Sequence, residues 1–195
     1  MRFWTVLALM FVVRTTFANQ YLVPTGSMEP TIAVGDRIFT NRVAYDLKLP
    51  FSHLALARLG EPARGDVVVF ESPREPGLVL VKRLIALPGD HLVIENGFVS
   101  LNGRRLDGFD GKETLGEHSY LPRHLPERTN RGFYDFTVPP DHYFFMGDNR
   151  DNSADGRYFG FVPRSLLIGR ASRVLFSLDL SQPVVRLERV GKRLD

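Results

Sequence analysis

A single serine lies on a turn whose sequence restricts the backbone, within Pro24–Thr31. Proline fixes its own backbone dihedral and glycine admits dihedrals that other residues avoid, so Pro24, Gly26 and Pro30 define the chain around Ser27. A hydroxyl that is held by its own backbone and open on one side is what a nucleophile requires. The same composition is typical of an ordinary surface turn, and the octapeptide alone favours that interpretation.

Lys82 is a candidate partner for this serine, because it is the one lysine of four that lies inside an apolar run, Leu78–Leu87. If the run is a strand, side-chain alternation places Lys82 on one face with Leu80 and Leu84. Burial disfavours the ammonium form and lowers a lysine pKa, and a neutral lysine is a competent general base near neutral pH. The alternative is a lysine at a strand edge that reaches solvent. Paired with Ser27, however, Lys82 predicts a serine–lysine nucleophile and base.

A third stretch, Gly147–Arg157, is too rich in Asp, Asn and Gly to be core, and it predicts a turn with many side-chain-to-backbone hydrogen bonds. Its acidic residues suggest a calcium loop, but the EF-hand pattern needs a terminal Glu and flanking helices, which this stretch lacks. We therefore expect no metal here. Asp155 and Arg157 are expected to pair, and Ser153 is a further hydroxyl in the same turn.

Composition excludes several classes of site. The chain of 195 residues fits one domain, or one core with an insertion. Its net charge of +3 comes mostly from scattered arginines, which argues against a nucleic-acid face and suits anionic lipid headgroups. Because there is no cysteine, disulfides, zinc–thiolate sites and a cysteine nucleophile are excluded. The five histidines show no ligand spacing.

The N-terminus carries an apolar run, Phe3–Val13, followed by Arg14. A spanning helix needs about 20 residues, which is reached if Arg14 snorkels and the helix continues to Tyr21. A cleaved signal peptide with a weak site at Thr16–Ala18 and a buried core helix are the alternatives. A charge directly after the apolar run favours a permanent anchor, which would hold Ser27 near a membrane surface.

The rest of the chain predicts a mainly antiparallel β architecture with little helix. Apolar runs bounded by turn signals predict strands at 37–40, 67–70, 78–87, 133–138 and 142–146, and an Asn-Gly turn predicts a hairpin over 92–101. Between 107 and 131, glycine, proline and charge dominate without a period, as in a loop-rich insertion. We therefore expect an anchor at 1–21, a catalytic β core at 22–93 and 136–195, and a short inserted β/loop subdomain at 94–135.

Taken together and in this order, the three stretches resemble bacterial type I signal peptidase, the family of membrane-bound serine–lysine leader peptidases. The turn at Ser27 matches the family motif Pro-Ser-Gly-Ser-Met-x-Pro-Thr, with Thr25 in place of the first serine. Four further stretches resemble the remaining family motifs: Val34–Tyr45, Gly65–Phe70, Val81–Asp90 and Gly147–Pro163. The resemblance covers about Phe3–Ser177.

The resemblance implies a mechanism in which the Lys82 amine takes the proton of Ser27, whose oxygen attacks the carbonyl at the end of a secretory signal peptide. The backbone N–H of Ser27 and the hydroxyl of Thr25 would hold the oxyanion. Ser153 would hydrogen-bond Lys82 and orient it. Asp155 and Arg157 would brace the turn that carries Ser153. Asp148 and Arg150 would lie next to these residues and support them.

The resemblance also implies substrates with small residues at the first and third positions before the cut, as in Ala-x-Ala. The expected pocket walls are Val23, Met28, Leu80 and Val81. No cofactor and no nucleic acid are expected. The partners would be signal peptides of exported preproteins and membrane lipid. The chain would cross the bacterial inner membrane once, with its catalytic domain on the outer face.

Other functions are compatible with the same sequence. The chain has Gly156 where relatives often carry serine, and one apolar segment where some have two, which leaves open a specialised relative that matures one exported or conjugative-pilus protein. A self-cleaving serine–lysine repressor of the LexA type would need a DNA-binding helical domain, and none precedes Ser27. A membrane-anchored β-rich binding protein without chemistry would have a Lys82 that titrates normally in solvent.

Overall fold

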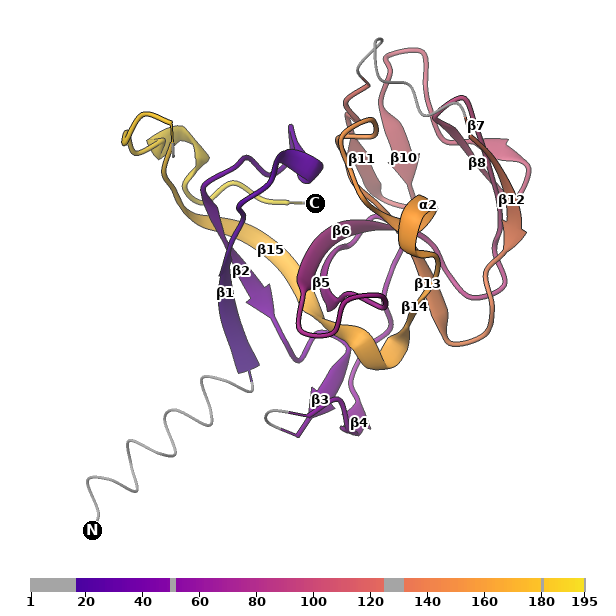
Figure 1. The fold of residues 1–195 in the computed structure, drawn as a ribbon, viewed down its shortest axis with the longest axis horizontal. Coiled ribbons are helices and arrows are strands. Elements are labelled where there is room, and N and C mark those ends of the chain that lie inside the picture. Colours follow the sequence, from indigo (N-terminus) through magenta and orange to yellow (C-terminus); the bar gives the residue numbers. More distant parts are fainter. Residues whose placement is uncertain (1–16, 50–51, 125–131, 180, 195) are drawn as a thin grey trace.

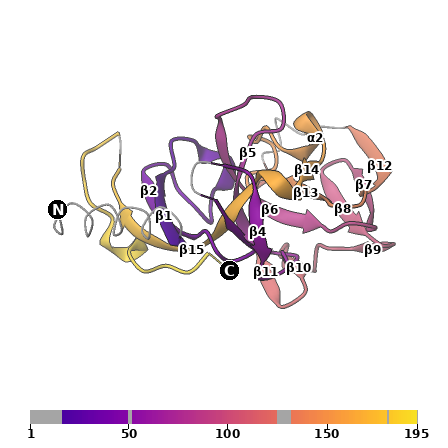
Figure 2. The same ribbon diagram turned by 90° about the horizontal axis from the view of Figure 1, so that it is seen from below.

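Two antiparallel sheets and two hairpins make up nearly all of the computed structural model, which describes residues 17–49, 52–124, 132–179 and 181–194 (Figures 1 and 2). The mainly antiparallel β class predicted from the sequence is confirmed. The larger sheet has the strand order β1-β2-β15-β5-β6-β13-β14. Its strands are β1 Ala18–Leu22, β2 Asp36–Asn41, β15 Leu167–Ser177, β5 Val67–Glu71, β6 Val79–Ala86, β13 His142–Met146 and β14 Val162–Pro163.

The N-terminal part of the described chain corrects one prediction. Ala18–Leu22 is a strand that pairs antiparallel with β2, in the register Ala18↔Asn41 to Leu22↔Arg37, so a helix does not continue to Tyr21. The polar residues Asn19 and Gln20 suit a half-exposed strand better than a membrane span. The predicted anchor otherwise lies outside the described residues, and among those that are described no helix is long and apolar enough to cross a membrane.

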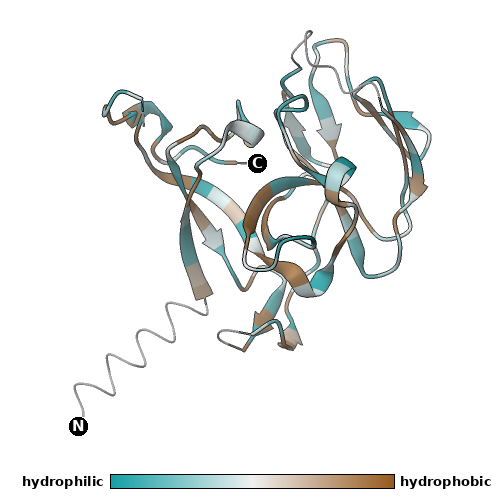
Figure 3. Ribbon diagram, viewed as in Figure 1, coloured by the Kyte–Doolittle hydropathy of each residue, from teal (hydrophilic) through white to brown (hydrophobic). Residues whose placement is uncertain are grey.

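The strands β5 and β6 form the centre of the molecule, where hydrophobic residues gather on the curled strands (Figure 3). Val67, Val68, Val69 and Phe70 of β5 are all buried, which explains their continuous apolar run. The last long strand, β15, lies between β2 and β5 and pairs with both. It is therefore the C-terminal part of the chain that joins the first two strands to the centre.

The smaller sheet, β12-β7-β8-β9, packs against β6 and β13 of the larger sheet through a shared apolar cluster. Asn96 and Gly97 both have positive φ, as the predicted Asn-Gly hairpin turn requires. This sheet begins at His91 and ends at Thr137, slightly outside the predicted insertion. Its strands and those of the two hairpins are β7 His91–Glu95, β8 Phe98–Leu101, β9 Arg104–Arg105, β12 Phe133–Thr137, β10 Glu113–Leu115, β11 His118–Tyr120, β3 Asp46–Lys48 and β4 Ala55–Arg58.

Helix is confined to short segments of the described chain. They are α2 Gly156–Phe159 and the 3₁₀ turns η1 Gly26–Met28, η3 Arg164–Leu166 and η4 Leu187–Arg189. Two of these segments lie at the residues singled out from the sequence, because η1 carries Ser27 and α2 comes directly after the polar turn that begins at Gly147.

Candidate active site

Ser27 lies in η1, the helical turn between β1 and β2, and it is only 8% exposed. Thr25 precedes the turn in an extended conformation, and its side chain does not cap η1. The N–H groups at the start of a helical turn have no partner within that turn, and the N–H of Ser27 is one of them. The two oxyanion donors implied by the resemblance are thus neighbours at the open start of η1.

Lys82 reaches Ser27 from β6, where it pairs opposite Val68 of β5. Its Nζ lies 2.6 Å from the Oγ of Ser27, and the residue is only 3% exposed. Burial lowers the pKa of Lys82 from 10.5 to about 8, and the negative charges of Asp155 and Asp148 offset part of that shift. A lysine with this pKa is partly neutral near physiological pH and can accept the serine proton.

The polar turn that begins at Gly147 packs directly against the Ser27 turn. The backbone N–H of Asn149 donates to the carbonyl of Ser27 at 3.1 Å, and its side-chain amide donates to the carbonyl of Gly26 at 2.9 Å. Gly147 permits this approach, because a Cβ there would lie 2.4 Å from the carbonyl oxygen of Ser27. Two segments far apart in the sequence therefore fix the backbone of the candidate nucleophile.

Asp148 is buried in the same turn and pairs with Arg83, the residue after Lys82. The guanidinium of Arg83 donates to both carboxylate oxygens at 2.8 Å, and the hydroxyl of Thr31 donates to Asp148 at 2.5 Å. Burial alone would lower the pKa of Arg83, but the charge and hydrogen bonds of Asp148 raise it above its ordinary value. The adjacent cations Lys82 and Arg83 are thus both buried, on opposite faces of β6.

Asp155 and Arg157 lie at the C-terminal side of this turn and join in a bidentate ion pair, with both hydrogen bonds at 2.8 Å. Asp155 also accepts the N–H of Gly147 at 2.9 Å and caps α2. Arg157 donates to the carbonyl of Arg150. The pair therefore closes the turn on itself and places a buried carboxylate near Lys82.

Ser153 does not make the predicted hydrogen bond to Lys82. Within the described chain its Oγ is buried without a hydrogen-bond partner. The hydroxyl lies against Gly147, where an added Cβ would come within 2.3 Å of it. Ser153 Oγ and the carbonyl oxygen of Ser27 therefore both lie close to Gly147.

Arg150 is held from the hairpin β10–β11, a contact that sequence reasoning missed. Both terminal nitrogens of Arg150 donate to the Glu113 carboxylate, and the Tyr120 hydroxyl donates to the same carboxylate at 2.5 Å. The Tyr120 ring also lies under the Arg83 guanidinium, with 3.9 Å between Cζ and the ring centre. The signal that could have revealed this hairpin is the glycine, Gly116, between the two short segments Glu113–Leu115 and His118–Tyr120.

The two buried carboxylates of the polar turn are thus occupied by cations of the protein itself, Asp148 by Arg83 and Asp155 by Arg157. Over the described ranges, no group of three or more histidine, aspartate or glutamate side chains is arranged to hold a metal ion. The carboxylates neutralise buried guanidinium groups and shape the electrostatic environment of Lys82.

A groove of about 230 Å³ leads to the Ser27–Lys82 pair, between the end of β1 and the start of β6. Three of the four predicted wall residues line it, namely Val23, Leu80 and Val81. Met28 does not; it is fully buried in the apolar cluster with Val23 and Ile38. Its place on η1 turns its side chain into the core, because Ser27 takes the side of the turn that faces Lys82.

Comparison with known proteins identifies the family to which this chain belongs. The family model described as signal peptidase, peptidase S26, matches residues 1–176. The chain belongs to the signal peptidase family. Two relatives are the signal peptidases I of Pseudomonas aeruginosa, 35% identical over 90% of this chain and 70% of the relative, and of Rickettsia prowazekii, 33% identical over 90% and 78%. The crystal structure of a signal peptidase I from Enterococcus faecalis is 32% identical and covers 57% of this chain and 97% of its own, with a TM-score of 0.42.

Membership of the signal peptidase family makes the chain a serine endopeptidase of a membrane-associated class. The resemblance stated from the sequence motifs is confirmed by these matches. The family match includes the turn at Ser27, the strand that carries Lys82 and the polar turn that begins at Gly147.

Proposed function

We propose that this protein removes N-terminal signal peptides from exported preproteins, cutting after small-x-small sites through a Ser27–Lys82 dyad and an acyl-enzyme. The observation that carries the proposal is the 2.6 Å contact between Nζ of Lys82 and Oγ of Ser27. Both residues are buried, and burial brings the pKa of Lys82 to about 8. A buried lysine in contact with a single serine is suited to general-base catalysis.

In the first half-reaction, neutral Lys82 accepts the hydroxyl proton of Ser27 as Oγ bonds to the carbonyl carbon at the cleavage site. The resulting oxyanion is stabilised by the N–H of Ser27 and the hydroxyl of Thr25. When the C–N bond breaks, the Lys82 ammonium returns its proton to the departing amine of the mature protein. The signal peptide is then held as an ester on Ser27.

In the second half-reaction, neutral Lys82 takes a proton from water, the hydroxyl adds to the ester carbonyl, and the ester C–O bond breaks. Ser27 recovers its proton from Lys82 and the signal peptide leaves as a carboxylic acid. Each time Lys82 becomes an ammonium it gains a donor, and the unpaired Oγ of Ser153, which lies close to Gly147 as the Ser27 carbonyl oxygen does, is the acceptor that we assign to it. Asp155 lowers the free energy of the same cationic state through its charge.

The groove supports an extended substrate. On one side β6 pairs with β5, while β13 pairs with it only at Arg83, Leu84 and Ala86. Within the described strands, Val79–Lys82 therefore has an open edge, to which a peptide could add as a further strand. The volume of about 230 Å³ is below the usual range for ligand clefts, which favours small side chains next to the scissile bond.

The apolar run Phe3–Val13 would anchor the chain in the inner membrane, with the catalytic domain on the outer face where translocated preproteins emerge. Such an anchor would also hold Ser27 close to lipid, because few residues separate the run from η1.

The test is cleavage of a preprotein with an Ala-x-Ala site by the full chain in nonionic detergent. Wild type would be compared with Ser27→Ala, Lys82→Ala and Lys82→Arg, and with Lys112→Ala as a matched control. Lys112 is exposed on the inserted part, where its side chain forms an ion pair with Asp110. We expect cleavage after the Ala-x-Ala site by wild type and Lys112→Ala, and none by the other three variants.

Retained activity in Ser27→Ala or Lys82→Arg would overturn the dyad, because arginine stays protonated and cannot act as the base. A folded wild type that leaves the general preprotein intact but cleaves one exported protein would show a dedicated peptidase instead.

A further inference from the structure

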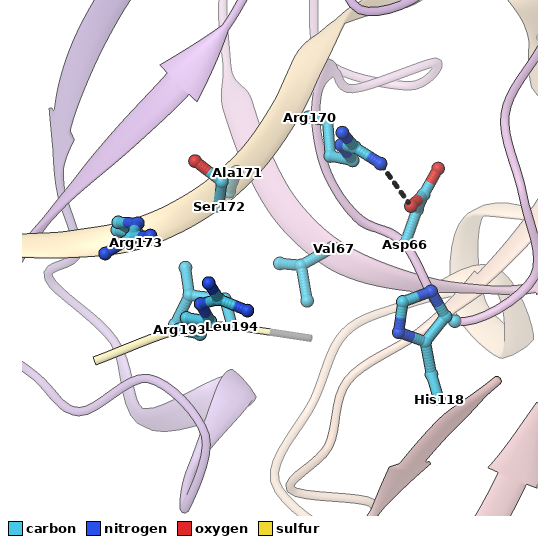
Figure 4. Close-up of a pocket in the computed structure, with 10 residues that line it drawn as sticks. Asp66, Val67, His118, Arg170, Ala171, Ser172, Arg173, Arg193 and Leu194 are labelled. Carbon is cyan, nitrogen blue, oxygen red and sulfur yellow. Dashed lines mark ion pairs between the residues drawn. The ribbon is translucent and has the colours of Figure 1, made fainter. Parts of the chain in front are cut away.

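A cavity of about 220 Å³ lies on the larger sheet, and none of its lining residues lines the groove at Ser27. It is formed where β15, the start of β5 and the C-terminal segment meet, with His118 at one side (Figure 4). The cavity is lined by three arginines, which are Arg170, Arg173 and Arg193. All three arginines are exposed, and together they give the cavity a positive potential that attracts anions.

One carboxylate lines the cavity, that of Asp66, and it is already engaged. Its Oδ2 accepts hydrogen bonds from the hydroxyl of Tyr45 at 2.9 Å and from the N–H of Ala63 at 3.0 Å. Its Oδ1 lies 3.6 Å from the guanidinium of Arg170. No carboxylate of the described chain forms an ion pair with either of the other two arginines, so among the described residues these two guanidinium groups lack a counter-charge.

The backbone forces these two arginines together. Arg173 and Arg193 are directly opposite each other in an antiparallel bridge. The bridge is fixed on both sides, because the N–H of Leu194 donates to the carbonyl of Ser172 and that of Val174 donates to the carbonyl of Lys192. Like charges opposite each other across strands are destabilising, so this pairing calls for an anion.

We propose that this cavity binds a phosphate group. The guanidinium groups of two directly opposed residues match the charge of a phosphate dianion, and each can donate two parallel hydrogen bonds to its oxygens. Arg170 and the ring of His118, which packs against Gly65, line the remaining wall. The phosphate group could belong to a lipid headgroup or to a free phosphate, since both present the same oxygens.

The test is calorimetric titration of the full chain in nonionic detergent at fixed ionic strength. The probes are inorganic phosphate, monomeric dihexanoylphosphatidic acid and, as a zwitterionic control, dihexanoylphosphatidylcholine. Wild type would be compared with the double variant Arg173→Gln/Arg193→Gln. The matched control is Arg37→Gln, an exposed arginine of the same sheet that does not line the cavity.

We expect the phosphate probes to bind wild type and Arg37→Gln equally, and to bind the double variant at least about tenfold more weakly, as loss of charge-assisted hydrogen bonds predicts. Tighter binding of the phosphatidic acid than of phosphate would identify a lipid headgroup as the source, and equal binding would identify free phosphate. Absence of binding, or equal affinity in the double variant, would overturn the site. Equal weakening in Arg37→Gln would show that phosphate responds to the overall positive charge and not to this cavity, and would also overturn the site. Preprotein cleavage by the double variant should stay at the wild-type rate, so this site and the dyad are tested separately.

Discussion

Buried lysines are usually paired with a carboxylate. Lys82 is buried but contacts the hydroxyl of Ser27 instead. The nearest carboxylates, Asp148 and Asp155, are paired with arginines. Their charge limits the fall of the pKa without giving Lys82 an ion-pair partner of its own. The amine is therefore kept in a range where it can both accept and release a proton near neutral pH.

The rate of cleavage should follow the deprotonation of Lys82. With its pKa lowered to about 8 by burial, kcat/KM should rise about tenfold per pH unit below that value and level off above about pH 9. The profile would be measured on the preprotein, with circular dichroism at each pH to verify folding. A midpoint near 10, as for a solvated lysine, would contradict the buried base.

The same burial should make Lys82 a source of instability. Below about pH 8 the lysine is protonated in both the folded and the unfolded chain, so the penalty for burying its charge is fully present. It disappears as the pH rises toward 10.5. Lys82→Met should therefore abolish cleavage yet stabilise the fold by up to about 3 kcal/mol at pH 7. Thermal unfolding at pH 7 and pH 10 would measure this, and a lower melting temperature for the variant at pH 7 would refute it.

Ser153 should affect the rate rather than the fold. Its Oγ has no partner among the described residues, so Ser153→Ala removes an unsatisfied buried group and should leave the melting temperature equal or higher. If the hydroxyl accepts from the Lys82 ammonium during the reaction, kcat should fall about tenfold or more. Ser119→Ala, an exposed serine of β11, is the control. A lower melting temperature with unchanged kcat would assign Ser153 a structural role.

At the scale of elements, the hairpin β10–β11 is tied to the active-site turn. Glu113 neutralises buried Arg150, and Tyr120 contacts both Glu113 and Arg83. The segment after the hairpin continues this connection, since Arg123 bonds to Glu29 and its backbone pairs with the turn at Asp148 and Arg150. The inserted part of the chain thus helps to fix the geometry around Ser27.

Glu113→Gln should therefore destabilise the protein and slow cleavage together. Removing one partner of a buried ion pair leaves Arg150 without a counter-charge, at a cost of about 3–5 kcal/mol. The control is Glu117→Gln, at the exposed tip of the same hairpin. Melting temperature and kcat/KM would be measured for both. Wild-type values for Glu113→Gln would mean that the hairpin does not support the site.

The sequence predicted elements well where one strong pattern dominates. The continuous run of β5 and the Asn96-Gly97 hairpin follow from local chemistry. It failed where tertiary pairing decides, as at β1, whose apolar N-terminal neighbour favoured a helix. The contacts of Glu113 with Arg150 and of Tyr120 with Arg83 could not be predicted either, because they come from a short hairpin in a segment without periodicity.

At the scale of the whole molecule, the first described strand begins at Ala18, and the apolar run Phe3–Val13 precedes it in the sequence. A chain that starts at Phe17 should keep its activity in detergent, because the sheet and the dyad remain complete. It should be released from membranes by alkaline carbonate, whereas the full chain should resist extraction. Resistance of the shortened chain would show that the folded part binds membranes by itself.

The position of β15 determines how late in synthesis the large sheet can be completed. Ser27 belongs to the connection between β1 and β2, and Lys82 belongs to β6, but the strand that lies between these two parts of the sheet is close to the C-terminus. During synthesis, the first strands therefore emerge without the element that joins them to the centre. We expect the Ser27–Lys82 contact to form only after Leu167–Ser177 has been synthesised. An enzyme built in this order should therefore stay inactive as a nascent chain until this late strand has been made.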